Sequence, residues 1–363
     1  MIPRLPRSFR RRHGWEAILL GALLVWLASS LAVLPTTART EHVRILLADR
    51  GGACRGDLLD RLKAAETRAL TLAQWMREGT LSPANPEASL RVLQPWFAHS
   101  PSFSFTLLHQ SSGHDLAFGR FSQRETRICE LINQDGEPRS RSLHLAASGH
   151  LTTGPWEESV YDPARRPWTA LAESLQTPAW AGPFVYQGLY TASAPCISYI
   201  APVRREDGGA QGAAVVDILL QELASLLEES APDPWVNLLL SDERGRILVV
   251  PRPLAHHFTQ IQQSGQIPTL SSSHLRAFHT LHEKDPRPSA AGSFQTLQVN
   301  GGTAHAWSCS LPTLPGVQWR LDLIADPDRA PTGPLGPILG PGSTLLFVLA
   351  LACVRVRAWF RED

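Results

Sequence analysis

Two long apolar runs stand near the ends of this chain. The first spans residues 15–34 and the second spans residues 335–354, and each is long enough to cross a bilayer as a helix. Arginines cluster on the outer flank of each run, in residues 1–14 and 355–363, and positive charge marks the cytoplasmic side of a span. The pattern predicts two transmembrane helices, a cytoplasmic basic N-terminus and a short cytoplasmic tail.

Each apolar run has an alternative interpretation. Small residues at 36–38 would suit a signal peptidase, but the run before them is longer than the roughly 7–15 apolar residues of a signal peptide. The second run could form a buried core helix, but its position at the C-terminus favours a membrane span. We therefore expect residues between the spans to lie outside the cytoplasm.

The pattern after the first run is helical. Apolar residues recur every three to four positions from residue 41 onward, with an interruption at the glycine-rich stretch 50–56. We therefore expect a long extracytoplasmic helix over residues 41–91 that carries the domains after it.

Short apolar runs then indicate strands. Residues 103–121 contain two such runs around a Ser-Ser-Gly turn, and residues 235–251 repeat this hairpin pattern with a turn at 242–245. Further strands are predicted at 141–147, 189–203, 292–299, 303–311 and 318–325, with a strand passing into an amphipathic helix at 210–229. The predicted fold class is α/β (α+β), with two tandem modules that we call the distal module (92–232) and the proximal module (233–328).

One short stretch, residues 161–168, concentrates polar and aromatic side chains. Pro163 and Pro167 restrict the backbone before them, so the sequence predicts a stiff turn that leads into a helix starting near Trp168. Such a turn can hold the neighbouring side chains in place. A surface loop with arginines stacked on Trp168 is the alternative.

The arrangement and this stretch together resemble the double Cache sensor domains of bacterial chemoreceptors and sensor kinases, whose modules are PAS-like. The resemblance covers roughly residues 41–328, and the matching residues of the amino-acid-binding branch are Tyr161, Arg166, Pro167, Trp168 and Asp217. Thr169 replaces a second Tyr of that pattern, and Phe184 and Tyr186 stand where it has Tyr-x-Asp. The resemblance implies a ligand site formed by Tyr161, Arg166, Trp168, Thr169, Phe184, Tyr186 and Asp217.

The chemistry of these residue types agrees with that implication. A guanidinium can bind a carboxylate through two hydrogen bonds and a phenol can donate another, so Arg166 and Tyr161 form a plausible carboxylate clamp. Asp217 could accept from a ligand ammonium, and Trp168 could supply an apolar face. With Tyr186 in place of an acid, we expect weaker selection for the amino group than the full pattern provides.

Each residue also has a structural alternative. Asp217 could cap the helix after it, Tyr161 could belong to the core, and Arg166 could pair with the acids among residues 157–162. The adjacent Arg165 is expected to be solvated or to form a salt bridge.

Composition and motifs narrow the function further. The 34 Lys and Arg nearly balance the 33 Asp and Glu, and no basic stripe suggests a nucleic-acid partner. The chain has no Gly-x-Ser-x-Gly, no His-Glu-x-x-His and no glycine-rich phosphate loop, which argues against an enzyme. We expect no enzymatic activity and no cofactor.

The cysteines and histidines carry no metal motif. Four cysteines lie in the region expected to be exported, where disulfides are permitted, and three pairings are open for them: Cys54, Cys129, Cys196 and Cys309. A group of histidines between residues 256 and 282 could in principle bind zinc or sense pH, but its spacing matches no metal motif. We expect these histidines to be solvated and no metal to be bound.

We therefore expect an extracytoplasmic sensor anchored in the inner membrane of a bacterium. It would contact lipid through its spans and bind a small carboxylate, either an amino acid or a related organic acid. A separate protein would receive the signal because residues 355–363 hold no kinase or methyl-accepting region. A homodimer is compatible with the resemblance. The alternatives are a scaffold subunit that has lost the ligand and a truncated receptor.

Overall fold

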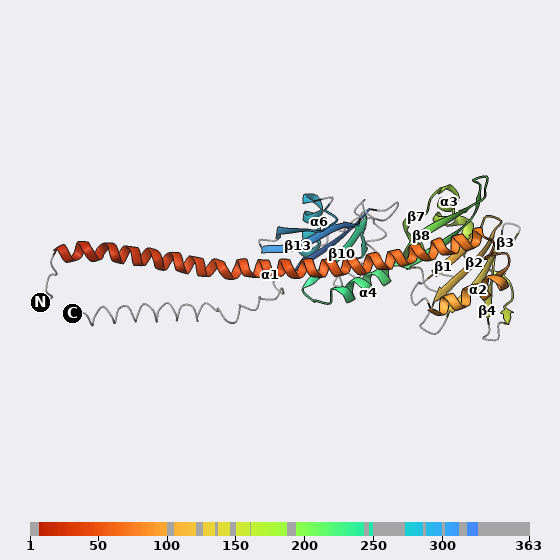
Figure 1. Ribbon diagram of the computed structural model, residues 1–363, viewed down its shortest axis with the longest axis horizontal. Helices are drawn as coiled ribbons and strands as arrows, with labels where there is room; N and C mark the ends of the chain where they lie inside the picture. Colours follow the sequence, from red (N-terminus) through yellow and green to blue (C-terminus); the bar gives the residue numbers. More distant parts are fainter. Residues whose placement is uncertain are drawn as a thin grey trace.

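The computed structural model describes residues 7–99, 105–120, 126–134, 137–145, 150–159, 161–186, 194–242, 247–249, 273–285, 288–299, 302–311 and 318–325. For residues 7–39 it describes the course of the backbone helix and not the side chains. Two mixed α and β units lie along one long helix (Figure 1), in agreement with the expected α+β fold class.

The long helix α1 (Arg7–Arg77) is continuous, so the expected interruption at residues 50–56 is wrong. The glycine at position 51 is explained by a contact with a distant strand and not by a break in the helix. A Cβ atom at Gly51 would lie 2.3 Å from Cε3 of Trp307. Glycine at this position admits the indole ring against the helix. The helix ends before Gly79, which has a φ of 75°, rather than at residue 91, and a separate helix, α2 (Pro86–His99), follows.

Within the described residues, the first sheet has nine strands. They are β1 (Phe105–Gln110), β2 (His114–Arg120), β3 (Thr126–Gln134), β4 (Glu137–Leu145), β5 (Leu151–Thr153), β6 (Glu157–Glu158), β7 (Ala179–Tyr186), β8 (Ala194–Arg204) and β9 (Ala210–Leu219). The order is β5-β4-β3-β2-β1-β9-β8-β7, with β6 paired to β4. The predicted hairpin at 103–121 is confirmed by the antiparallel pair β1 and β2.

The second described sheet has five strands in the order β11-β10-β14-β13-β12. They are β10 (Val236–Asp242), β11 (Ile247–Val249), β12 (Ser293–Val299), β13 (Gly302–Leu311) and β14 (Trp319–Ala325). Two helices accompany this part of the chain, α4 (Leu220–Ser230) before β10 and α6 (Ser273–Lys284) before β12. The hairpin expected at 235–251 is confirmed by the pairing of β10 with β11.

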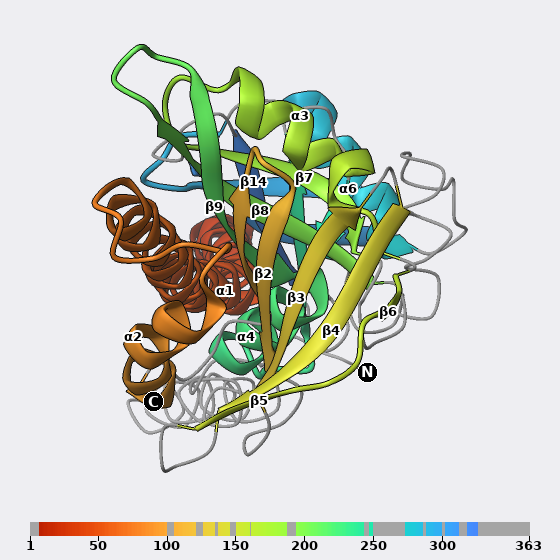
Figure 2. The same ribbon diagram turned by 90° about the vertical axis from the view of Figure 1, so that its right-hand side faces the viewer.

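Helix α1 packs against one face of both sheets. Its buried residues recur at helical spacing and join a core that includes residues of β8, β9, β13 and β14: Val43, Leu47, Cys54, Leu58, Leu62, Ala65, Ala69 and Leu72. The side chains of β1 and β9 alternate between this core and a second core on the opposite face, which holds Trp168 of helix α3 (Pro167–Ser174). Figure 2 shows α1 and α3 on different sides of the first sheet.

The two sheets also touch directly. The rings of Trp180 in β7 and Trp319 in β14 lie 6.1 Å apart between centroids. The indole N–H of Trp180 donates a hydrogen bond of 2.9 Å to Glu66 of α1. One tryptophan therefore links the first sheet both to the second sheet and to the long helix.

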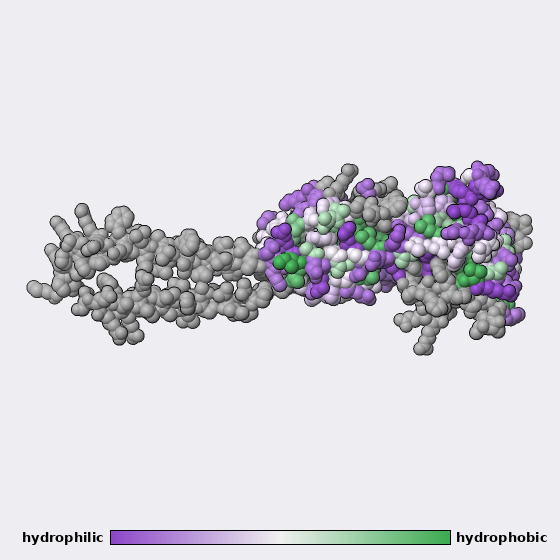
Figure 3. All heavy atoms as spheres, viewed as in Figure 1, coloured by the Kyte–Doolittle hydropathy of each residue, from purple (hydrophilic) through white to green (hydrophobic). Residues whose placement is uncertain are grey.

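On the face of the molecule that Figure 3 shows, apolar and polar residues are interspersed over the described part of the chain. Large exposed apolar side chains of the described residues are Ile45, Leu70 and Leu171, and single exposed side chains of this kind are normal. The four cysteines Cys54, Cys129, Cys196 and Cys309 are buried, and none of these four forms a disulfide.

In the described part of the chain, no helix is both long and apolar enough to cross a membrane. The backbone of residues 15–34, the first expected span, belongs to α1. The second expected span, 335–354, lies outside the described residues. Both spans stay predictions.

Candidate functional site

The stretch 161–168 forms the stiff turn that the sequence predicts. A short 3-10 helix, η1 (Pro163–Arg165), leads directly into α3, which has a proline in its first turn. The hydroxyl of Thr169 donates a 2.5 Å hydrogen bond to the carbonyl of Pro163. The side chain of Thr169 therefore connects the 3-10 turn to the first turn of α3.

Tyr161 and Trp168 lie together beneath this turn, each only 6% exposed. Both side chains belong to the same hydrophobic cluster. Burial, with a further contribution from the charge of Asp217, raises the pKa of Tyr161 above its ordinary value. The phenol therefore keeps its proton at neutral pH and can act as a hydrogen-bond donor.

Arg166 lies next to this pair at the start of α3. Its guanidinium carbon is 4.5 Å from the centroid of the Tyr161 ring, which is a cation–π contact, and the residue is half-buried. Arg165, in contrast, has a side chain that is 87% exposed and pairs with Asp162 at 3.1 Å. The prediction that the two neighbouring arginines point to different surroundings is confirmed.

Asp217 approaches the same cluster from β9. It is 9% exposed, and the hydroxyl of Ser198 in β8 donates a 2.6 Å hydrogen bond to its carboxylate. Burial raises the pKa of Asp217 to about 6, and the bond from Ser198 partly opposes that effect. Helix α4 starts later, with Leu219 at its N-cap, so the alternative in which Asp217 caps this helix is wrong.

The two remaining candidates lie in β7. Phe184 is half-buried and packs against the core that contains Tyr161 and Trp168. The backbone of Tyr186 pairs with Ala194 of β8, but its side chain lies outside the described residues. The structure therefore brings together Tyr161, Arg166, Trp168, Phe184 and Asp217, and it places Thr169 in the turn beside them.

Sequence reasoning missed a buried acid–base pair in the same cluster. The Nδ1 atom of His109 in β1 lies 2.6 Å from the carboxylate of Asp115 in β2, and the His109 ring meets Trp168 edge-on with centroids 5.4 Å apart. Burial raises the pKa of Asp115, and His109 opposes this. The hairpin register, which pairs His109 with Asp115, is the signal in the sequence that could have revealed them.

The fold can be compared with known proteins. No family model and no curated protein matches the chain. One similar solved structure is an extracellular domain assigned to a histidine kinase, soHK1S-Z6, with a TM-score of 0.51, 14% identity and coverage of 80% of this chain and 96% of that one. Another is the sensory domain of the Campylobacter jejuni chemoreceptor Tlp3 with isoleucine bound, with a TM-score of 0.51, 13% identity and coverage of 82% and 98%.

The chain has the fold of these sensory domains. At such identities the likeness concerns the fold alone, and for the fold it confirms the resemblance to double Cache sensors. One neighbour is the extracellular domain of a protein assigned as a histidine kinase, and the other is the sensory domain of a chemoreceptor.

Three of the histidines noted in the sequence belong to a helix of the second unit, and the other two lie outside the described residues. The three are His274, His279 and His282 of α6, and the other two are the histidines at 256 and 257. Across the described part of the chain, no three His, Cys, Asp or Glu side chains come close enough to hold a metal ion.

Proposed function

We propose that this chain is an extracytoplasmic sensor whose distal module binds a small molecule with a carboxylate and a cationic group, of the α-amino acid type. The site is the cluster of Tyr161, Arg166, Trp168, Phe184 and Asp217. The resemblance adds Tyr186 to this site, and Thr169 supports the turn.

The observation that carries the proposal is the state of Asp217. Its carboxylate is buried, and among the described residues no cationic side chain lies within ion-pair distance of it. A buried carboxylate without a counter-charge is costly, and it is stabilised when a cation arrives. A ligand ammonium would provide that charge.

The opposite end of the ligand would meet Arg166 and Tyr161. The guanidinium of Arg166 can bind a carboxylate through two hydrogen bonds, and the protonated phenol of Tyr161 can donate a third. Tyr161 contacts Arg166, and the charge of Asp217 contributes to the raised pKa of the Tyr161 phenol, so a positive and a negative partner lie near the same side chain. This arrangement suits a short zwitterion.

The similar solved structures support this choice of ligand class. Structures of the Tlp3 sensory domain hold isoleucine and L-valine, the latter with a TM-score of 0.50 to this chain. Their ligands are amino acids with an apolar side chain, and Trp168 and Phe184 would offer apolar contact here.

The test is a screen of α-amino acids and their deaminated analogues against the full-length chain, with thermal unfolding and calorimetry as measurements. We expect Arg166→Ala to remove binding, because the loss of the charged partner of a desolvated carboxylate costs roughly 2–5 kcal/mol. Arg165→Ala is the matched control and should bind as the parent does.

The results separate three outcomes. Stabilisation by amino acids alone supports a ligand cation at Asp217. Stabilisation by the deaminated acids as well supports the weaker selection that Tyr186 suggests. If no compound of either set binds, the scaffold alternative is favoured and the sensor proposal is wrong.

Anchoring and signal relay complete the proposal. The apolar run at 15–34 is part of α1, whose later residues pack on both sheets, so a shift within the distal module would reach the membrane along one helix. A ligand that binds two conformations with different affinity would bias the position of that helix. A separate membrane protein of the bacterial inner membrane would receive the signal.

A further inference from the structure

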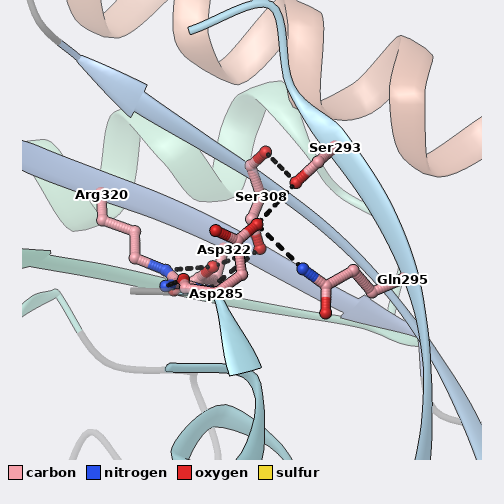
Figure 4. A network of polar contacts seen from close by, with 6 residues as sticks. All are labelled: Asp285, Ser293, Gln295, Ser308, Arg320 and Asp322. Carbon is pink, nitrogen blue, oxygen red and sulfur yellow. Dashed lines mark hydrogen bonds and ion pairs between the residues drawn. The ribbon is translucent and has the colours of Figure 1, made fainter. Parts of the chain in front are cut away.

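The second sheet contains a buried polar cluster that the distal ligand site does not involve. Asp322 in β14 is 2% exposed, and the hydroxyl of Ser308 in β13 donates a 2.6 Å hydrogen bond to its carboxylate. The Nε atom of Arg320 lies 2.8 Å from both carboxylate oxygens of Asp322. All three side chains are at least nine-tenths buried (Figure 4).

This cluster lies at the place in its sheet where Asp217 lies in the first sheet. The strands β10, β14 and β13 follow one another in the same order and orientation as β1, β9 and β8. Asp322 faces Ser308 across the strand pair as Asp217 faces Ser198, and the serine–carboxylate distance is 2.6 Å in both.

The two pairs also share a face. Asp217 points to the same side of its sheet as Val215, which belongs to the core with Trp168 and not to the core with α1. Asp322 likewise points to the same side of its sheet as Ile324. Ile324 belongs to a core with residues of α6, and α1 contributes none of the described residues of that core. Each serine–carboxylate pair therefore lies on the sheet face opposite the long helix.

The two serine–carboxylate pairs differ in the residue that stands two positions before the aspartate. Two positions before Asp217 stands Val215, a buried apolar side chain, whereas two positions before Asp322 stands Arg320. The proximal carboxylate thus has a guanidinium from its own strand, and the distal carboxylate has none among the described residues.

We propose that Ser308 and Asp322 form a second cation-binding site, equivalent to that of Ser198 and Asp217, and that the side chain of Arg320 occupies it as an internal ligand. The class of ligand that this site takes is a compact guanidinium. This inference stands on the geometry of the proximal module and does not require the distal site to bind an amino acid.

The contacts of Arg320 match those expected of a bound ligand. Besides the Asp322 carboxylate, its guanidinium donates to the backbone carbonyl of Asp285 and to the hydroxyl of Ser308 at 3.4 Å. Asp285 follows α6, and its carboxylate accepts hydrogen bonds from Gln295 at 2.9 Å and Ser293 at 3.2 Å (Figure 4). The guanidinium thus joins the end of α6 to β13 and β14.

The occupied site gives the two modules different roles. With Arg320 in place, the proximal carboxylate already has its counter-charge and its hydrogen bonds, so an external cation has little to gain there. Of the two carboxylates, the distal one is open to a ligand. In the proximal module, Arg320 holds the end of α6 against the sheet.

Chemical rescue tests the inference directly. Arg320→Ala removes Cγ, Cδ and the guanidinium group, which together correspond to ethylguanidinium. We expect the thermal midpoint of the full-length variant to fall by about 6–20 °C, since Asp322 is left buried without a partner. Millimolar ethylguanidinium at about ten times its dissociation constant should then raise the midpoint by about 3–6 °C.

Two controls make the rescue specific. Ethylguanidinium should not raise the midpoint of the parent chain, whose site is filled, or of the double variant Arg320→Ala with Asp322→Asn, whose site lacks the charge. Ethylammonium, which lacks the planar donors, should rescue less. Failure of ethylguanidinium to stabilise Arg320→Ala, or an equal effect on all three proteins, overturns the inference.

The experiment also gives a result if Arg320→Ala does not fold alone. The variant is then refolded with and without ethylguanidinium and followed by circular dichroism. Recovery of the folded signal only with ethylguanidinium supports the internal-ligand site, and absence of recovery overturns it.

Discussion

Replacing Asp217 by Asn should stabilise the ligand-free chain at neutral pH while removing its proposed ligand contact. Burial raises the pKa of Asp217 from 3.8 to about 6 in the folded chain, so the ionised carboxylate is less favourable folded than unfolded. The difference corresponds to about 3 kcal/mol in the free energy of unfolding at pH 7. Asn keeps an acceptor for Ser198 without the charge.

The net gain is smaller because the new amide brings an N–H group that needs a partner. Leaving such a donor unsatisfied costs about 1 kcal/mol, so we expect Asp217→Asn to be more stable than the parent by about 2 kcal/mol at pH 7. Since protonation removes the same charge from the parent, this difference should shrink as the pH falls through about 6 toward 4.

The assay is urea unfolding of the parent and the variant at several pH values between 4 and 8, without ligand. The difference between the two proteins isolates Asp217 from the other buried acids, among them Asp115 and Asp322. Asp60→Asn, at an exposed position of α1, is the control and should change stability little at any pH. A difference between parent and Asp217→Asn that stays constant with pH would refute the argument.

Three further predictions concern other parts of the chain. Gly51→Ala should destabilise by about 1–3 kcal/mol in thermal unfolding because its Cβ would overlap an indole ring, whereas Gly52→Ala, with open space around it, should stabilise by up to about 1 kcal/mol. Arg204→Ala should cost about 1–3 kcal/mol, because Arg204 donates to the carbonyls that end α3; exposed Arg205→Ala should cost less than about 0.5 kcal/mol. A reporter active only outside the cytoplasm, fused after Asp363, should be inactive, and activity would contradict the two-span topology.

Elements with local causes could be predicted from the sequence. The hairpin of β1 and β2 follows from two apolar runs around Gly113, which has a φ of 87°, and the start of α3 follows from its proline. The continuity of α1 could not be predicted, because one of the glycines that suggest a break, Gly51, is explained by Trp307, a residue far along the chain.

Some residues of the candidate site could also be predicted from the local sequence, and others depend on distant contacts. Tyr161, Arg166 and Trp168 stand within one short stretch, so their spacing shows them together before any fold is known. His109, with Asp115 bonded to it, reaches Trp168 only because β1 and α3 share one core. Their separate positions in the sequence carry no sign of that contact beyond the hairpin register.

The sequence by itself determined the two-module α+β order, the stiff turn at 161–168 and the different surroundings of Arg165 and Arg166. Only the tertiary structure decided which buried carboxylate already has a counter-charge: Asp322 is paired with Arg320, while Asp217 lies beside Val215. Turns and helix starts depend on neighbouring residues, whereas the free energy of a buried charge depends on the strands and helices that fold around it.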